Sequence, residues 1–271
     1  MAESALSESE VAAAAAPEAG LLVFEQPLNE RMRTFLRLDF LYNQALYHNE
    51  MGSQWGSRAA VSSLIDILAI MTRDIRSDVL KELEGQLASL NEFQSRPGVD
   101  AQRLKSVTAN LLRLRADLAG ANSAVLQPLR DSEFLNSLKL RTGIPGGTCE
   151  FDLPDYYFWL SQPDELRMRT FNQWLALLRP LCDAIAELVW LTRQNGRTRE
   201  EVARGGTFNI AFDRDHPLQL LRISLPAAAG LYPEISGSHH RCNLRFLAWN
   251  GLGSRPTQTE EDVPFTLSCC A

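Results

Sequence analysis

The hydrophobic pattern of this chain changes its period once, and this single change limits the folds that are open to it. From residue 30 to about residue 195, apolar side chains recur every three or four positions, which is typical of helices with one buried face. After Gly205 and Gly206, apolar and polar residues alternate, which is typical of strands with one buried face. Helices and strands in separate parts of one chain define an α+β fold. We therefore expect a helical bundle and a segregated antiparallel β-domain.

Capping residues divide the helical part into segments. Asn29 and Asp100 each precede an apolar helical repeat, where their side chains can accept hydrogen bonds from free backbone N–H groups. Pro163 suits the first position of a helix because its fixed φ angle is already helical. These signals predict helices from 30 to about 51, after 57, after 77, after 100, after 131 or 132, and from 163 to about 194.

Several short segments with alternating or β-prone residues are candidate strands. They lie at 22–26, 148–153, 207–212, 218–225, 231–235, 241–248 and 264–269. The strands of the C-terminal tail need further partners to close a two-sheet sandwich, and the first two segments can supply them. The β-domain is then expected to comprise 21–27, 144–154 and 205–271, and the helical domain 30–143 and 155–196.

The first 20 residues differ in composition from the rest of the chain. They contain four glutamates, no lysine or arginine and a run of five alanines, so we expect residues 1–20 to be a disordered acidic leader. The net charge of the chain is −6, and subtracting the leader's −4 leaves −2 for the remainder. A slightly acidic domain is a poor partner for nucleic acid, and we expect none.

Neither a membrane span nor a secretion signal is expected. The sequence has no run of about 18 apolar residues, and the leader lacks the basic start and apolar stretch of a signal peptide. The five cysteines include no CxxC pair, which favours reduced thiols in the cytoplasm. The sequence therefore predicts a cytoplasmic protein.

Motifs of the common enzyme classes are missing from the sequence. It contains no GxxxxGK[ST], GxGxxG, HExxH or GxSxG pattern, and its four histidines have no catalytic partner at a diagnostic spacing. Catalytic groups can be assembled in space from distant residues, so a small-molecule enzyme stays an alternative. We expect no catalytic residues, no metal, no cofactor and no small-molecule substrate.

Arginines on regular elements are the clearest sign of a binding site. Alternation along the strand predicted at 241–248 places Arg241, Asn243 and Arg245 on one face. At about 3.3 Å per residue the two guanidinium groups lie about 13 Å apart, which suits two acidic groups on an extended ligand. Arg33 and Arg37 form a similar pair on the first helix. The alternative is that these arginines only pair with nearby acids on a solvated surface.

Consecutive aromatic residues form a cluster at 156–159, with the sequence YYFW. Such a cluster either packs into a core or forms a ligand cage or a base-stacking platform. Core packing is the expected role, because large aromatic side chains gain most from burial.

Blocks spread over nearly the whole chain beyond the leader resemble the ZapD family of cell division factors. The blocks stand in the family's order with suitable spacing, and their joint occurrence is specific although each alone is weak. They are FEQPLNERMRTFLRLDFL at 24–41, VLKELE at 79–84, PGVD at 97–100, IPGGTCEFDLP at 144–154, LYPEISG at 231–237 and the terminal CC.

This resemblance implies a homodimer whose protomers each have a helical domain and a β-domain. It also implies that the protein binds the C-terminal tail of FtsZ, cross-links FtsZ protofilaments at the division ring and thereby lowers FtsZ GTPase activity indirectly. An adaptor for another protein partner is the alternative.

The family's basic FtsZ-binding surface maps onto Arg73, Arg241, Arg245 and Arg37 of this chain. Two positions depart from the family pattern. Glu133 stands where a basic residue is expected, and Tyr157 replaces a histidine, which favours the set formed by Arg73, Arg241 and Arg245.

Overall fold

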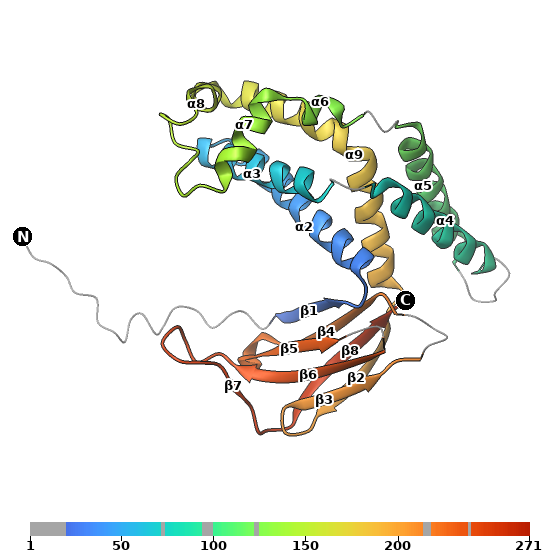
Figure 1. The fold of residues 1–271 in the computed structure, drawn as a ribbon. Helices are drawn as coiled ribbons and strands as arrows, with labels where there is room; N and C mark the ends of the chain where they lie inside the picture. Colours follow the sequence, from blue (N-terminus) through green and yellow to red (C-terminus); the bar gives the residue numbers. More distant parts are fainter. Residues whose placement is uncertain (1–19, 72–73, 94–99, 122–124, 214–217, 238–239) are drawn as a thin grey trace, which may run out of the picture. The chain divides into compact units, whose positions relative to one another are not determined.

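The computed structural model describes residues 20–71, 74–93, 100–121, 125–213, 218–237 and 240–271 (Figure 1). Over these ranges the chain forms helices first and antiparallel strands afterwards, apart from one N-terminal strand, which confirms the α+β class. The described residues divide into two compact units. One contains the chain up to Met32 together with Thr192–Ala271, and the other contains Arg33–Leu191.

The first unit contains two antiparallel sheets that share one core. The first sheet has the strand order β1-β4-β8-β2, and the second has the order β3-β6-β5, with β7 also paired to β6 (Figure 1). The bounds are Leu21–Pro27 for β1, Arg197–Ala203 for β2, Thr207–Ala211 for β3, Leu220–Pro226 for β4, Leu231–Gly237 for β5, Arg241–Ala248 for β6, Thr257–Gln258 for β7 and Val263–Cys270 for β8.

Alternate side chains of both sheets point into the space between them. Phe246 of β6 and Phe265 of β8 are almost fully buried, with ring centroids 5.2 Å apart. Leu244 faces the same core from β6, as do Ile223 from β4 and Leu267 from β8. The strands β4, β6 and β8 therefore each have a buried apolar face, and β6 carries the candidate arginines on its outward face.

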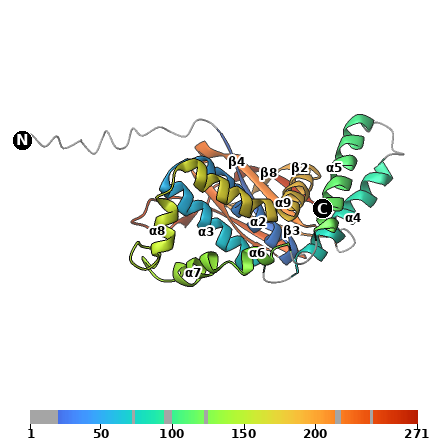
Figure 2. The ribbon, with the colours of Figure 1, turned by 90° about the horizontal axis from the view of Figure 1, so that it is seen from above.

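The helices of the second unit begin where the sequence places capping side chains. The Asn29 side chain accepts a hydrogen bond from the Met32 backbone at 2.8 Å, and Asp100 caps the helix that follows it. The helices α4 and α5 form an antiparallel pair (Figures 1 and 2). The bounds are Glu30–Glu50 for α2, Gln54–Ile70 for α3, Arg76–Phe93 for α4, Ala101–Gly120 for α5, Gln127–Arg130 for α6, Glu133–Thr142 for α7, Pro154–Leu160 for α8 and Asp164–Gln194 for α9.

The strand predicted at 148–153 is wrong, because this segment forms consecutive turns. Its backbone groups find partners within the segment: Cys149 donates to the Gly146 carbonyl at 3.0 Å, and Leu153 donates to the Cys149 carbonyl at 3.1 Å. Gly146 has a φ angle of +72°, which turns the chain sharply just before this segment. Phe151, which the alternating pattern places in a core, is 86% exposed.

The strand β2 was not predicted, since its sequence RTREEVA has almost no apolar residues. Among the described strands it pairs with β8 alone and forms one edge of its sheet. Charged side chains are a common feature of edge strands, because they discourage pairing with other chains.

The start of α3 also differs from prediction. Ser53, rather than Ser57, caps this helix by accepting a hydrogen bond from Gly56.

No helix within the described ranges is long and apolar enough to cross a membrane.

Candidate protein-binding site

The strand β6 alternates strictly between exposed and buried side chains over its first six residues. Arg241, Asn243 and Arg245 are exposed, and the residues between and after them are buried in the sandwich core. The predicted alternation is therefore confirmed. Because β6 lies between β3 and β5, its outward side chains are flanked by those of two neighbouring strands.

The register of the sheet aligns these outward side chains in rows across three strands. Thr207 of β3 and Glu234 of β5 lie opposite Arg245. In the next row, Asn209 and Ser236 lie opposite Asn243, and Ala211 of β3 lies opposite Arg241. The outward face of this sheet is therefore polar around two arginines, and we call it the β6 face, defined by these eight residues.

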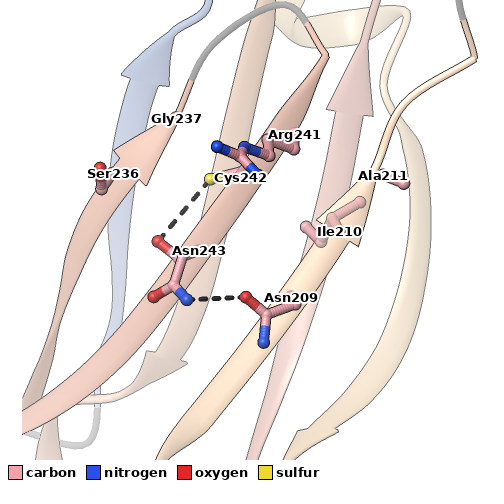
Figure 3. A pocket seen from close by; sticks show the side chains of 8 residues that line it. All are labelled: Asn209, Ile210, Ala211, Ser236, Gly237, Arg241, Cys242 and Asn243. Atoms are coloured by element: carbon pink, nitrogen blue, oxygen red, sulfur yellow. Dashed lines mark hydrogen bonds between the residues drawn. The ribbon is translucent and has the colours of Figure 1, made fainter.

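A shallow groove with a volume of about 800 Å³ lies at the Arg241 end of the β6 face (Figure 3). The Asn243 and Asn209 side chains point toward one another across β6 and β3, and the Asn243 amide nitrogen donates to the Asn209 oxygen at 2.7 Å. The groove is lined by Asn209, Ile210, Ala211, Ser236, Gly237, Arg241, Cys242 and Asn243. Its chemistry is that of a polar surface with one cation, which suits hydrogen bonds to a peptide and a carboxylate.

The two arginines of the β6 face differ in their electrostatic surroundings. Arg245 forms an ion pair with Glu234, and both side chains are about half exposed. Arg241 has no ion pair or side-chain hydrogen bond with any residue in the described part of the chain, and it is exposed. Exposed ion pairs contribute little to stability, so an incoming carboxylate can replace Glu234 at low cost. Both guanidinium groups are therefore accessible to an acidic ligand.

The structure does not place the other two predicted arginines relative to this face. Arg73 lies outside the described residues. Arg37 is exposed on α2, in the unit formed by Arg33–Leu191. Among the described residues of the predicted set, Arg241 and Arg245 share one strand face.

The aromatic cluster divides into a packed half and an exposed half. Tyr156 and Trp159 stack with centroids 6.0 Å apart, and Phe134 and Trp174 lie against Trp159. Tyr157 and Phe158 remain 42% and 69% exposed. The prediction of core packing is therefore right for the first and last residues of the cluster, because the short helix α8 turns the middle two away from the core.

Sequence reasoning missed a second hollow, of about 640 Å³, beside α3. The Arg58 guanidinium lies 5.5 Å from the Trp55 ring centroid and 5.1 Å from that of Tyr156, and it donates to the Thr148 carbonyl at 2.9 Å. Burial raises the pKa of the Tyr156 hydroxyl to about 12. The guanidinium group of Arg58 is engaged by these contacts within the protein. Arg58 therefore anchors the turn segment at 143–153 to α3. The sequence signal for this contact was a tryptophan three residues before an arginine on a predicted helix, since side chains at that spacing lie on the same helix face.

Burial makes several of the cysteines poorer nucleophiles. All five are free thiols. Burial raises the pKa of Cys242 and of Cys270 to about 11, and it raises the pKa of Cys182 as well. A thiol with a raised pKa stays protonated near neutral pH and reacts slowly. Within the described ranges, no three His, Cys, Asp or Glu side chains are grouped so that they could hold a metal ion.

Comparison with known proteins identifies relatives along nearly the whole chain. The model of the family described as "ZapD: Cell division protein" matches residues 36–245. The cell division protein ZapD of Methylococcus capsulatus is 39% identical over 251 residues, which cover 92% of this chain and 98% of that protein. The ZapD proteins of a Janthinobacterium species and of Yersinia pseudotuberculosis are each 36% identical, and the alignments cover 93% and 92% of this chain and 100% and 97% of theirs.

Proposed function

Because this chain belongs to the ZapD family of cell division proteins, we propose that it acts in division by binding the C-terminal tail of FtsZ and cross-linking FtsZ protofilaments. The protein then acts as a binding partner and carries out no catalysis of its own. The observation that carries the proposal is the β6 face, where two exposed arginines of one strand flank an asparagine.

The spacing along β6 supports an extended acidic ligand rather than a single small anion. Arg241 and Arg245 are four residues apart, so their side chains leave the strand about 13 Å from each other. One phosphate cannot reach both, whereas two carboxylates of an extended tail can. Each guanidinium offers a planar pair of N–H donors that matches a carboxylate. The polar side chains between them can donate to and accept from the peptide backbone.

Cross-linking requires two tail sites in one particle, and we propose a homodimer that provides them. In a symmetric dimer each protomer has the same site, so two filaments can be joined by identical contacts. Once the first tail is bound, the second site meets its filament at a high effective concentration. Bundled filaments are expected to exchange subunits more slowly, which lowers GTPase activity without any contact to the nucleotide. We propose accordingly that the protein acts in the cytoplasm, at the division ring at midcell.

Low-speed co-sedimentation with FtsZ and GTP tests this proposal. The unmodified protein should pellet with FtsZ, and Arg241→Glu should abolish pelleting because it places a negative charge where a carboxylate must bind. A matched control is Arg199→Glu, which reverses an exposed arginine on β2 in the other sheet. The control should pellet like the unmodified protein. Equal pelleting of Arg241→Glu and the unmodified protein, with both folded by circular dichroism, contradicts the site assignment.

An adaptor for a different protein is the second candidate. The exposed Tyr157 and Phe158 on α8 favour it, because exposed aromatic side chains are common at protein interfaces. Failure of the unmodified protein to pellet with FtsZ at low salt would support this candidate instead.

A further inference from the structure

The outward row of β6 changes from basic to apolar as the strand ends. After Arg245, the next residue of the same alternation is Leu247, which is half-buried and lies opposite Tyr232 of β5. The one after it is Trp249, which is 60% exposed. The Trp249 backbone continues the antiparallel pairing, since its N–H donates to the Gly230 carbonyl at 3.4 Å. The row therefore leads from two cations to a large exposed aromatic ring.

The loop that follows β6 adds a second exposed apolar side chain. Leu252 is 96% exposed. Side-chain hydrogen bonds hold this loop in shape: the Asn250 amide donates to Thr257 Oγ1 at 3.0 Å, and Ser254 Oγ donates to the Asn250 carbonyl at 2.7 Å. The residues from 247 to 256 include no acidic side chain. Leu247, Trp249 and Leu252 are therefore apolar side chains at and just beyond the end of the strand that carries the two arginines, and we call these three residues the apolar end.

We infer that the apolar end is a second part of the same peptide site and that the bound segment carries large apolar side chains next to its acidic residues. The inference rests on the proposed function and specifies the chemistry of the ligand. Trp249 lies eight residues beyond Arg241, so an extended peptide of about 26 Å reaches both. Tryptophan is among the residue types that most often carry binding free energy when a partner covers them.

The two parts of the site make different contributions to binding. Arg241 and Arg245 attract the ligand through charge, an effect that salt screens over about 8 Å at physiological ionic strength. The apolar end contributes by removing apolar surface from water, an effect that salt does not weaken. Acidic residues alone therefore give a salt-sensitive, weak complex, and an added apolar residue gives tighter binding that persists in salt.

Fluorescence anisotropy with synthetic peptides tests this inference directly. The first probe is a fluorescein-labelled, serine-based peptide of about twelve residues with two glutamates four residues apart, matching the spacing of the two arginines. The second has two leucines added about four residues beyond the glutamates, and a third has the reverse order, because either chain direction is compatible with the strand. We expect one of the leucine peptides to bind about tenfold tighter than the first probe.

Variants of Trp249 separate the two parts of the site. Trp249→Ala should remove the gain from the leucines and leave the affinity for the glutamate-only peptide unchanged, whereas Trp249→Phe should keep most of the gain. Arg241→Glu should weaken binding of all three peptides. Equal affinity of the unmodified protein for all three peptides, or a gain that survives in Trp249→Ala, would overturn the inference.

Parallel measurements distinguish failure of this inference from failure of the proposed function. If Arg241→Glu loses FtsZ while Trp249→Ala binds FtsZ like the unmodified protein, the apolar end is not part of the site and the proposed function stands. If Trp249→Ala halves the mass in solution, measured by light scattering, a second copy of the chain covers the patch and the inference is wrong. If the unmodified protein pellets with phosphatidylglycerol vesicles and Trp249→Ala does not, the apolar end binds a lipid surface and the inference is wrong.

Discussion

Arg241 and Arg245 have the same side chain and share one strand face, yet their electrostatic environments differ. Arg245 already has a carboxylate partner in Glu234, whereas Arg241 has none among the described residues. An acidic ligand must displace Glu234 to reach Arg245 but meets no competitor at Arg241. In the proposed site, Glu234 would therefore compete with the ligand for Arg245 and lower the affinity.

Removing that competitor should strengthen binding. We expect Glu234→Gln to bind an FtsZ tail peptide about two- to fivefold tighter, because an exposed ion pair of this kind contributes up to about 1 kcal/mol. Fluorescence anisotropy of a labelled tail peptide measures the change. Asp117→Asn is the matched control, since it frees Arg113 from a similar exposed pair on α5 and should leave binding unchanged. Unchanged or weaker binding by Glu234→Gln would argue against a role for Arg245.

The buried thiols should make stability fall at high pH. Unfolded thiols ionise near pH 9, whereas burial holds Cys242 and Cys270 protonated until about pH 11. Between these values the unfolded state releases protons that the folded state retains, so the free energy of unfolding decreases as pH rises from 9 to 11. Urea denaturation at pH 8 and pH 10.5 measures the decrease. It should be smaller in the Cys242→Ala, Cys270→Ala variant, and an equal decrease in both proteins would contradict this account.

At the scale of elements, Arg58 explains how a segment without regular structure keeps its place. Its guanidinium stacks on Trp55 and Tyr156 and donates to the Thr148 carbonyl, which joins α3 to the turns that precede α8. A Cβ atom on Gly147 would lie 2.6 Å from the Arg141 carbonyl oxygen, so the turn also needs a glycine at this position. The segment is held by one cation and by close backbone packing.

Loss of this cation should destabilise the helical unit. We expect Arg58→Ala to lower the free energy of unfolding by about 2 kcal/mol, from the lost hydrogen bond and the lost ring contacts. Arg58→Lys should restore only part of it, because an ammonium group lacks the planar stacking surface. Urea denaturation followed by circular dichroism measures both variants. A loss below about 0.5 kcal/mol in Arg58→Ala would mean that the turns hold without it.

The same elements indicate how far the sequence predicts the fold. The cap at Asp100 and the alternation from Arg241 to Phe246 were readable because each depends on residues that are adjacent in the chain. The turns at 148–153 were not, because the same alternating residues also fit a strand, and this segment has no partner strand and bonds to its own backbone instead. The strand β2 was not, because it depends on pairing with the distant β8. For the candidate site, the sequence predicted the row of arginines but not the pairing of Arg245 with Glu234, which depends on cross-strand register.

At the scale of the whole molecule, the proposed cross-linking requires one FtsZ tail site in each protomer and two protomers in each particle. The fold provides an arginine-bearing face on a sheet whose core is well packed, so the site does not depend on a mobile loop for its geometry. Family membership establishes a role in cell division, and the β6 face suggests how that role is carried out. The proposed bundling then follows from symmetry rather than from any catalytic step.

Isothermal titration calorimetry of the FtsZ C-terminal tail peptide into this protein tests the central claim most directly. We predict one peptide per protomer for the unmodified protein, with affinity that falls as salt is raised, and no detectable heat of binding for the folded Arg241→Glu, Arg245→Glu double variant. Binding of the peptide to that double variant with unchanged affinity would contradict the claim that the β6 face holds the tail.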